Sequence, residues 1–407
     1  MSKRKIFNDP VYGFITIPYK IIFDLIEHPF FQRLRRIRQL GLTHLVYPGA
    51  LHTRFHHALG ALHLMCSAIE TIRSKGHEIT EEEAKAVCIA ILLHDIGHAP
   101  FSHALEESIV AGVKHEQISE LFMNALNKEL NGELELAIEI FKGTYHKKFL
   151  HQLVSSQLDM DRLDYLNRDS FFTGVEGNIE SERIIKMLDV FDDLLVIEEK
   201  GIYSIEKFII ARRLMYWQVY LHKTVIAAEQ LLVMILKRAK EITSEGKELF
   251  APSAFKRFLN HTYTSDNFIS KPELLNEYAM LDDYDVHASI KTWLQSDDKV
   301  LSYLCNGMVN RNLYKIRIQK QKFDESVIKS CREKAMQQMK ITEHEASFLV
   351  FAGTISNSAY DPNEEQIKIL SRNGNLQNLT EASDQFELAV LSKPVEKHYV
   401  CIARNLI

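Results

Sequence analysis

Apolar residues recur with helical spacing over most of the chain, from residue 21 to about residue 245. In the segment 28–41 one apolar stripe consists of Phe30, Phe31, Leu34 and Ile37. This spacing is typical of a helix that buries one face. The same pattern predicts a longer helix over 54–75, which ends at Gly76 with basic residues in its last turn.

A capping box marks the start of the next predicted helix. Thr80 and Glu83 form the T-x-x-E pattern, in which two side chains satisfy backbone amides at a helix N-terminus. The run 86–93 (AVCIAILL) is almost wholly apolar, so we expect this end of the helix to be buried. Further helices are expected over 206–240 and, with turns near Pro252 and Pro272, over 250–340.

The two ends of the chain have strand character instead. Residues 1–20 are expected to form a short extended arm, because FITIP alternates like a strand. From about residue 345 the segments SFLVFAGTIS, QIKILSRNG and HYVCIARN are rich in β-forming residues. We therefore predict a mostly α-helical fold. It has a helical domain with its N-terminal arm over residues 1–340 and a small α+β region over 341–407.

Composition and charge are those of an ordinary globular protein. Hydrophobic residues make up 46% of the 407 residues and charged residues 25%. The net charge of −5 argues against broad coating of a nucleic acid. The longest apolar run is far shorter than the roughly 20 residues that span a bilayer. MSKRKIFNDP lacks an apolar stretch, so we do not expect it to be a signal peptide. With five widely spaced cysteines, we expect a cytoplasmic protein with reduced thiols and no membrane or nucleic-acid partner.

The adjacent pair His94–Asp95, at the end of the predicted apolar helix, is the strongest candidate for chemistry. The segments TRFHHALG and DMDRLDYLNRD add His57 and Asp161. Two imidazoles and two carboxylates are a ligand set for a divalent metal: Mn, Fe, Ni, Co or Zn, or with added waters Mg. The alternative is a buried His–Asp pair that only caps the helix, since an ionised buried Asp needs a cation or strong hydrogen bonds.

Several sequence blocks together carry a resemblance to a known family. They are KIFNDPVYG (5–13), FQRLRRIRQLG (31–41), YPGALHTRFHHALG (47–60), HDIGHAPFSHALE (94–106), HEQIS (115–119), DMDRLDYLNRD (159–169) and ARRLMYWQVYLHK (211–223). Their order and spacing resemble the HD-domain phosphohydrolase superfamily, and within it the deoxynucleoside triphosphate triphosphohydrolases. The resemblance covers roughly residues 5–235 and implies an HD-domain helical bundle.

The resemblance implies which residues bind the metal and which take part in catalysis. The metal ligands are His57, His94, Asp95 and Asp161. His56 departs from the pattern, because relatives often have an acidic residue there. The catalytic residues are His103, with Glu106 one helical turn away to orient its imidazole, and His98 and His115, which hold phosphate oxygens or a second ion.

The implied substrate site combines arginines with aromatic and polar residues. Arg54 precedes a ligand by one turn and Arg162 follows Asp161 directly, so both are expected near the metal, where guanidinium groups bind phosphate. Arg212 is a phosphate-binding residue on the resemblance alone. The sugar and base are expected to contact Gln39, Tyr165, Asp169 and Tyr220.

A basic run near the N-terminus has two interpretations. Arg33, Arg35, Arg36 and Arg38 point away from the apolar stripe, which favours a solvated helix face. In regulated relatives this stretch and the KIFND arm form an activating nucleotide site between subunits. The resemblance therefore implies a homo-oligomer with a candidate allosteric site at Lys5, Asn8, Gln32 and Arg35. Glu27 stands where guanine-activated relatives have Asp, so the activating base is not predicted.

The sequence thus predicts a metal-dependent triphosphohydrolase that converts a dNTP to a deoxynucleoside and inorganic triphosphate. Water activated by the ion attacks the α-phosphorus, and His103 assists proton transfer. Two other classes remain open. The first is another HD-type nucleotide phosphohydrolase, such as a nucleotidase or a phosphodiesterase. The second is a nucleotide-binding sensor with weak activity.

Overall fold

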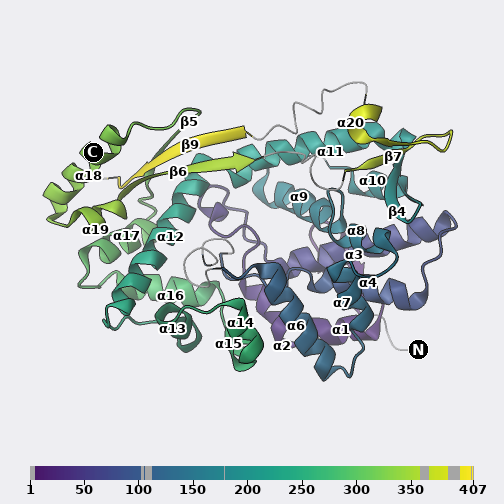
Figure 1. Cartoon of the computed structure of the whole chain (residues 1–407), viewed down its shortest axis with the longest axis horizontal. Coiled ribbons are helices and arrows are strands. Elements are labelled where there is room, and N and C mark those ends of the chain that lie inside the picture. The colour runs from purple at the N-terminus through teal and green to yellow at the C-terminus, as the bar shows by residue number, and fades with distance from the viewer. Residues whose placement is uncertain are drawn as a thin grey trace.

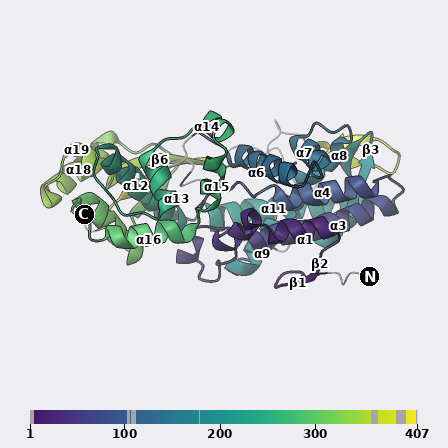
Figure 2. The same ribbon diagram turned by 90° about the horizontal axis from the view of Figure 1, so that it is seen from below.

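Helices make up most of the computed structural model, which confirms the mostly α-helical class (Figure 1). It describes residues 5–101, 105, 112–177, 179–357, 366–383, 395–404 and 406. The molecule is elongated: helices α3 (Arg54–Ser74) and α4 (Glu81–Leu93) lie toward one end, and α18 (Glu325–Met339) lies toward the other (Figures 1 and 2).

The remaining helices follow in chain order. The N-terminal ones are α1 (Lys20–Glu27), α2 (Pro29–Gln32), α6 (His115–Glu129), α7 (Glu135–Lys142), α8 (Lys148–Val154), α9 (Met160–Thr173) and α10 (Ser181–Met187). The later ones are α11 (Ile202–Met215), α12 (Lys223–Ser244), α13 (Ser253–Asn260), α14 (Ser265–Ser270), α15 (Glu273–Ala279), α16 (Asp283–Trp293), α17 (Lys299–Val309), α19 (Glu343–Ser347) and α20 (Leu379–Ala382). Short 3₁₀ turns cover Arg33–Arg36, Thr43–Leu45 and Glu199–Gly201, and a π-helical turn covers Tyr216–Tyr220.

The strands form separate small sheets. The predicted extended arm at the N-terminus is present, and it folds into an antiparallel hairpin of β1 (Ile6–Asp9) and β2 (Gly13–Thr16). A second sheet has the order β3-β4-β7-β8 and consists of Leu188–Phe191, Leu194–Glu198, Lys368–Leu370 and Leu376–Asn378. A third has the order β5-β9-β6 and consists of Lys315–Gln319, Val395–Ile402 and Val350–Asn357.

Hydrogen bonds cross the expected domain boundary at residue 340. Strand β9 pairs with β5 along Lys315–Gln319, and β7 pairs in parallel with β4. The C-terminal strands therefore complete sheets whose other strands come from the helical part of the chain. The division into domains over 1–340 and 341–407 stays a prediction.

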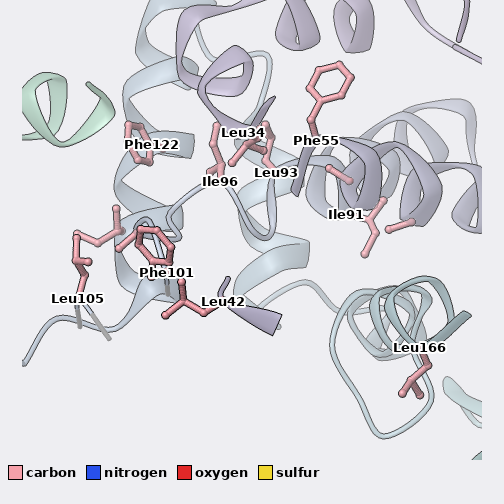
Figure 3. Close-up of a cluster of buried hydrophobic side chains, with 14 of the residues drawn as sticks. Leu34, Leu42, Phe55, Ile91, Leu93, Ile96, Phe101, Leu105, Phe122 and Leu166 are labelled. Carbon is pink, nitrogen blue, oxygen red and sulfur yellow. The ribbon is translucent and has the colours of Figure 1, made fainter. Parts of the chain in front are cut away.

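Helix α3 packs against both α4 and α9 in the core that supports the site. The capping box at Thr80 and Glu83 is present, and α4 is buried from Val87 to Leu93 as its apolar run predicts. Figure 3 shows part of the same core, in which Phe55, Ile91 and Leu166 are buried. The site described below therefore rests on helices whose faces are fixed by packing.

The helix expected over 206–240 is interrupted. The chain leaves α11 through the π-helical turn Tyr216–Tyr220 and restarts at α12, with 56° between the two segments. His222 begins the second segment, because its Nδ1 accepts a hydrogen bond from the backbone amide of Thr224 (3.2 Å). The apolar spacing runs through this break without glycine or proline, so periodicity alone predicts one helix.

A hairpin also replaces expected helix at β3–β4. Its turn consists of Asp192 and Asp193, which adopt left-handed backbone conformations with φ of 50° and 62°. Two left-handed residues suit the tight turns that join twisted strands, and Asp tolerates this conformation better than most residues. The alternation in LDVFDDLLVIE is the strand signal that helical periodicity obscured.

The sequence contains no apolar run long enough to span a bilayer, and the helices of the structure can be compared with this prediction. No single helix in the described part of the chain is long and apolar enough to cross a membrane. The bent pair Glu199–Tyr220 and Lys223–Ser244 reaches that length and composition only when its two segments are taken together.

Candidate metal centre and substrate cavity

Three elements bring the predicted metal ligands together. His57 lies in the first turns of α3, His94 caps α4, and Asp161 lies in the first turn of α9. Helix α9 starts at this point because Asp159 accepts a hydrogen bond from the backbone amide of Arg162 (2.7 Å), a helix N-cap. The site is therefore formed where one helix ends and two others begin.

His57, His94 and Asp161, the donor cluster, converge on one point. The Nε2 atoms of the two histidines lie 3.4 Å apart, and Asp161 Oδ1 lies 3.1 Å from His57 Nε2 and 3.4 Å from His94 Nε2. Each histidine uses its other nitrogen elsewhere: Nδ1 of His57 pairs with Asp164 Oδ2 (2.8 Å), and Nδ1 of His94 with the carbonyl of Ile91 (2.6 Å). With both Nδ1 atoms donating, both Nε2 lone pairs face the same point.

This arrangement fits a divalent cation. Two imidazole lone pairs and a carboxylate oxygen facing each other repel unless a positive charge lies between them, and a carboxylate or carbonyl behind each imidazole is typical of metal-binding histidines. The pKa values show the same demand for positive charge. Burial lowers the pKa of His57, but its hydrogen bonds to Asp161 and Asp164 outweigh burial and raise it to about 10. The identity of the ion is not determined by this donor set.

Asp95 connects the donor cluster to a second cluster, which consists of Asp95, His98 and His115. Asp95 Oδ1 lies 3.5 Å from His94 Nε2 and 3.2 Å from His98 Nδ1, although the latter pair is not aligned for a hydrogen bond. The rings of His98 and His115 lie 3.8 Å apart. Burial and the nearby Arg54 guanidinium lower the pKa of His98 to about 3, so this imidazole is neutral at physiological pH.

A close contact with α6 holds the turn that carries the second cluster. Ser119 donates to the carbonyl of His94 (2.7 Å) and accepts from the amide of Gly97 (2.9 Å). A Cβ atom at Gly97 would lie 2.3 Å from both the carbonyl of His115 and the amide of Ser119. Glycine is therefore what allows α6 to bring His115 beside His98.

Arg33 corrects the prediction of a solvated arginine face. Helix α2 ends at Gln32, and the following 3₁₀ turn directs Arg33 into the core, where it is 0% exposed. Its guanidinium donates to the carbonyls of Leu281 (3.0 Å), Ile96 (3.0 Å) and His98 (2.5 Å). Arg33 is thus a structural clamp on the turn that carries the predicted ligands, whereas Arg35 and Arg36 are exposed.

A cavity of about 630 Å³ opens beside the two clusters. Of the predicted residues, it is lined by Gln39, Arg54, Asp95, His98, His115, Asp161, Arg162, Tyr165, Asp169 and Tyr220. Two arginines reach it, and each is paired with one carboxylate. Arg54 Nη1 donates to Asp95 Oδ2 (2.5 Å), and Arg162 Nη1 donates to Asp159 Oδ2 (2.5 Å). The cavity thus combines positive groups with the carboxylates of the candidate metal centre.

Asp169 and Tyr220 form a fixed polar pair in the cavity wall. Tyr220 Oη donates to Asp169 Oδ2 (2.7 Å), and the other carboxylate oxygen lies 2.7 Å from His52 Nε2. The ring of His52 stacks on Phe172 at 4.4 Å. Because His52 fixes the Asp169 carboxylate, the position of the pair in the cavity is set before any ligand binds.

Arg212 and His56 are not part of this cavity wall. Arg212 is buried at the end of α11, with its guanidinium 5.9 Å from the ring centre of Tyr216, and does not line the cavity. His103 and Glu106 lie outside the described residues. His56 caps α3 with its Nδ1 2.9 Å from Thr53 Oγ1, which gives this departure from the family pattern a local structural role.

The candidate allosteric residues lie around α1 and the N-terminal hairpin. Lys5 Nζ lies 4.8 Å from the centre of the Phe23 ring. Gln32 accepts a hydrogen bond from Arg35 Nε (2.9 Å). Lys5, Asn8 and Arg35 are exposed, so they are accessible in a single chain. A nucleotide site at these residues stays a prediction.

The sequence reasoning missed residues that complete the site. Asp164 and His52 hold His57 and Asp169, and α12 and the π-helical turn contribute Tyr216, Glu229, Gln230 and Val233 to the cavity. Asp164 had a usable signal, because it follows Asp161 by one helical turn and therefore lies on the same face of α9. The α12 residues had none, since only the break between α11 and α12 brings them to the cavity.

Comparisons with known proteins agree with this geometry. The HD domain model matches residues 54–193, and the HD associated region matches residues 179–265. The uncharacterized protein YwfO of Bacillus subtilis is 33% identical over 100% of this chain and 94% of its own. The deoxynucleoside triphosphate triphosphohydrolase SAMHD1 homolog of Dictyostelium discoideum is 30% identical, over 77% of this chain and only 60% of its own.

A solved structure agrees over nearly the whole chain. A phosphohydrolase of Bacteroides thetaiotaomicron has a TM-score of 0.96 and 54% sequence identity, covering 99% of this chain and 100% of that chain. Together with the matching HD domain and the full-length bacterial relative, this likeness establishes the family predicted from the sequence blocks. The chain belongs to the HD-domain family of phosphohydrolases.

Proposed function

We propose that the chain hydrolyses deoxynucleoside triphosphates to a deoxynucleoside and inorganic triphosphate with the help of a divalent metal. The observation that carries this proposal is one cavity with three kinds of group. The carboxylates of the candidate metal centre are Asp95 and Asp161, and the arginines are Arg54 and Arg162. The third kind is the hydrogen-bonded pair of Asp169 and Tyr220. The relative from Dictyostelium discoideum named for this activity supports the same substrate class.

The metal would be held by His57, His94, Asp95 and Asp161. When bound, the ion supplies positive charge to phosphate oxygens and makes water more acidic. The protein contributes the orientation of the ligands, since Asp164 and the Ile91 carbonyl fix both imidazole rings. These hydrogen bonds direct both Nε2 atoms to one point, so little reorganisation is needed on binding.

Arg54 and Arg162 would bind the triphosphate. Both reach the cavity, and Arg162 Nε is buried without a hydrogen-bond partner among the described residues. Guanidinium groups bind phosphate oxygens through paired donors and stabilise negative charge as the phosphorus–oxygen bond breaks. Their anchors, Asp95 and Asp159, hold each guanidinium in place.

Asp169 and Tyr220 would bind the sugar. Asp169 accepts a hydrogen bond from the 3′-hydroxyl, and Gln39, whose Oε1 is buried without a partner among the described residues, lies in the same cavity wall. The ring of Tyr220 lies 6.3 Å from that of Tyr165, and together they form an aromatic wall. Such a wall beside the 2′ carbon leaves no partner for a ribose 2′-hydroxyl, which disfavours ribonucleotides.

His103, oriented by Glu106, is proposed to give a proton to the departing 5′-oxygen. This role rests on the sequence blocks and not on geometry, since both residues lie outside the described part of the chain. Water adds its oxygen to the α-phosphorus as the bond to the 5′-oxygen breaks. The imidazoles of His98 and His115, beside Asp95, are proposed to contact phosphate oxygens.

Chromatography of the products formed from dNTPs, NTPs and cyclic nucleotides, with Mn²⁺, Mg²⁺, Fe²⁺ or Ni²⁺ added, tests the proposal. We expect a deoxynucleoside and inorganic triphosphate from dNTPs. Orthophosphate as the first product would instead indicate a nucleotidase, and opening of a cyclic nucleotide a phosphodiesterase. Nucleotide binding without turnover under all four metals would indicate a sensor.

A further inference from the structure

A chain of buried charges runs from the N-terminal hairpin to the candidate metal centre. Arg168 Nη1 donates to Asp9 Oδ2 (2.7 Å), and Arg168 Nε donates to Asp164 Oδ2 (3.0 Å). The same Asp164 oxygen lies 2.8 Å from His57 Nδ1. All four side chains are at least 97% buried. One guanidinium therefore connects a strand of the hairpin to a metal-binding imidazole.

Asp9 is held firmly in this chain by its own backbone. It closes the β1–β2 hairpin turn, where its Oδ1 accepts from the amides of Val11 (2.9 Å) and Tyr12 (3.0 Å). The carboxylate consequently cannot move relative to the hairpin. The position of the hairpin on the helices therefore determines the position of the Asp9 carboxylate relative to the Arg168 guanidinium.

Gly60 shows that the surrounding helix accommodates the ion pair. A Cβ atom at this position would lie 2.0 Å from Asp164 Oδ1 and 2.1 Å from Arg168 Nη2. Gly60 follows His57 by one turn of α3, so the charged pair packs directly against the backbone beside the predicted ligand. Any other residue type at this position would carry a Cβ atom, which would keep the ion pair farther from the helix backbone.

Two carboxylates share one guanidinium. Asp9 and Asp164 both pair with the single positive charge of Arg168. Without Asp9, the Arg168 guanidinium would pair with Asp164 alone. It would then offset more of the negative charge of the Asp164 carboxylate that contacts His57. A more negative partner behind an imidazole strengthens the imidazole as a metal ligand.

We propose that Asp9 is a positioning residue of the metal centre, which acts on His57 through Arg168 and Asp164. The inference rests on the proposed function, because it takes His57 as a ligand. It implies that docking of the N-terminal hairpin strengthens metal binding, and that metal binding, by thermodynamic reciprocity, strengthens docking of the hairpin. The hairpin then controls the metal centre from outside the substrate cavity.

Mn²⁺ titration of metal-free full-length protein, with free Mn²⁺ followed by electron paramagnetic resonance, tests the first half. Asp9→Asn keeps the shape and the Oδ1 acceptor but removes the charge and places an amide NH₂ against Arg168. Removing a direct partner of a metal-binding histidine costs about 10- to 100-fold in affinity, which we expect for Asp164→Asn. Asp9 acts one step further away, so we expect about a 3- to 10-fold weaker affinity for Asp9→Asn.

The matched control is Asp24→Asn, the same chemical change in an exposed pair with Lys20 on α1. We expect it to bind Mn²⁺ like the wild type. In the double variant, Asp9→Asn should add little to Asp164→Asn, because the first residue acts through the second. Wild-type affinity of Asp9→Asn, or full additivity in the double variant, overturns the inference.

Hydrogen exchange of the wild type tests the second half without a variant. Mn²⁺ should slow exchange of the amides in Ile6–Thr16 more than in the hairpin β3–β4, which does not contact the donor cluster. Equal slowing of the two hairpins, or none, overturns the inference even if Asp9→Asn folds poorly. No measurement uses a nucleotide, so a different substrate leaves the inference intact, whereas a wild type that binds no Mn²⁺ removes both proposals.

Discussion

The chemistry of single residues depends on which atoms are already engaged. Two histidine side chains are neutral donors only if their protons lie on the far nitrogen, and here Asp164 and the Ile91 carbonyl take those protons. A sequence identifies the imidazoles but not these partners. The hydrogen bonds behind the ligands are therefore what turns a His-Asp motif into a candidate metal centre.

Asp161→Asn tests the donor cluster with almost no change in shape. The amide cannot supply a charged oxygen between the two imidazoles. Losing a residue that only hydrogen-bonds a ligand costs up to about 100-fold in metal affinity, so loss of this ligand should lower Mn²⁺ affinity by more than about 100-fold. Metal content by elemental analysis and turnover should fall together, while the circular dichroism spectrum stays that of the wild type. Full turnover by metal-free protein would refute the assigned role.

Metal binding should depend on pH in a defined direction. Hydrogen bonds to Asp161 and Asp164, outweighing burial, raise the pKa of His57 to about 10, so this imidazole is protonated near neutral pH until a metal displaces the proton. Affinity for Mn²⁺ should therefore rise with pH, by about tenfold per unit for one displaced proton, as long as the pH is below this pKa. Titrations at several pH values measure the slope, and a flat profile contradicts this prediction.

Two variants of Tyr220 separate its ring from its hydroxyl. Tyr220→Ala removes the aromatic wall, so the preference for dNTPs over NTPs in kcat/KM should fall by about tenfold or more, because an unpaired buried hydroxyl costs about 1–3 kcal/mol. Tyr220→Phe keeps the wall and loses only the hydrogen bond to Asp169 (2.7 Å in the wild type). It should keep the preference and raise KM for both classes. Equal preference in all three proteins excludes the ring as the sugar gate.

At the scale of elements, sequence patterns predict those helices and strands that are determined by residues close together in the chain. The capped α4, the long α3 and the extended N-terminal arm follow from a capping box, apolar spacing and alternation, and they carry His94, His57 and Asp9 respectively. The patterns fail where the deciding contact is distant. Arg33 reaches the carbonyl of Leu281, 248 positions away, and no periodicity near residue 33 contains that information.

The 3₁₀ turn Arg33–Arg36 provides a direct comparison of two neighbouring arginines. Arg33→Met leaves three buried carbonyls without their charged donor, so the free energy of unfolding should fall by at least about 3 kcal/mol. Arg35→Met removes an exposed guanidinium from the face of Phe55, a loss of less than about 1 kcal/mol. Urea unfolding followed by circular dichroism measures both, and equal losses would restore the solvated-face interpretation for Arg33.

At the scale of the whole molecule, the N-terminal hairpin has two different faces. Asp9 and Ile15 are buried on its inner face, whereas Ile6 and Phe14 are exposed on the outer face, 57% and 72% respectively. Asn8, paired with Phe14 across the hairpin, lies on the outer face beside them. An apolar outer surface next to the candidate allosteric residues suits contact with a second copy of the chain.

Light scattering tests this assembly. We expect a mass of at least two chains of 47.1 kDa each, with or without dNTP, and a shift toward the single-chain mass for the double variant Ile6→Ser/Phe14→Ser. A wild type that has the mass of one chain and full activity on each single dNTP contradicts both the homo-oligomer and the activating site.

Hydrolysis of dATP in ¹⁸O-labelled water, followed by mass spectrometry of the products, tests the central claim most directly. Attack of water on the α-phosphorus breaks the bond to the 5′-oxygen. It should therefore yield unlabelled deoxyadenosine and inorganic triphosphate that carries the label. Labelled orthophosphate with dADP, or pyrophosphate with dAMP, would contradict the account, because the water would then have attacked a different phosphorus or displaced a different leaving group.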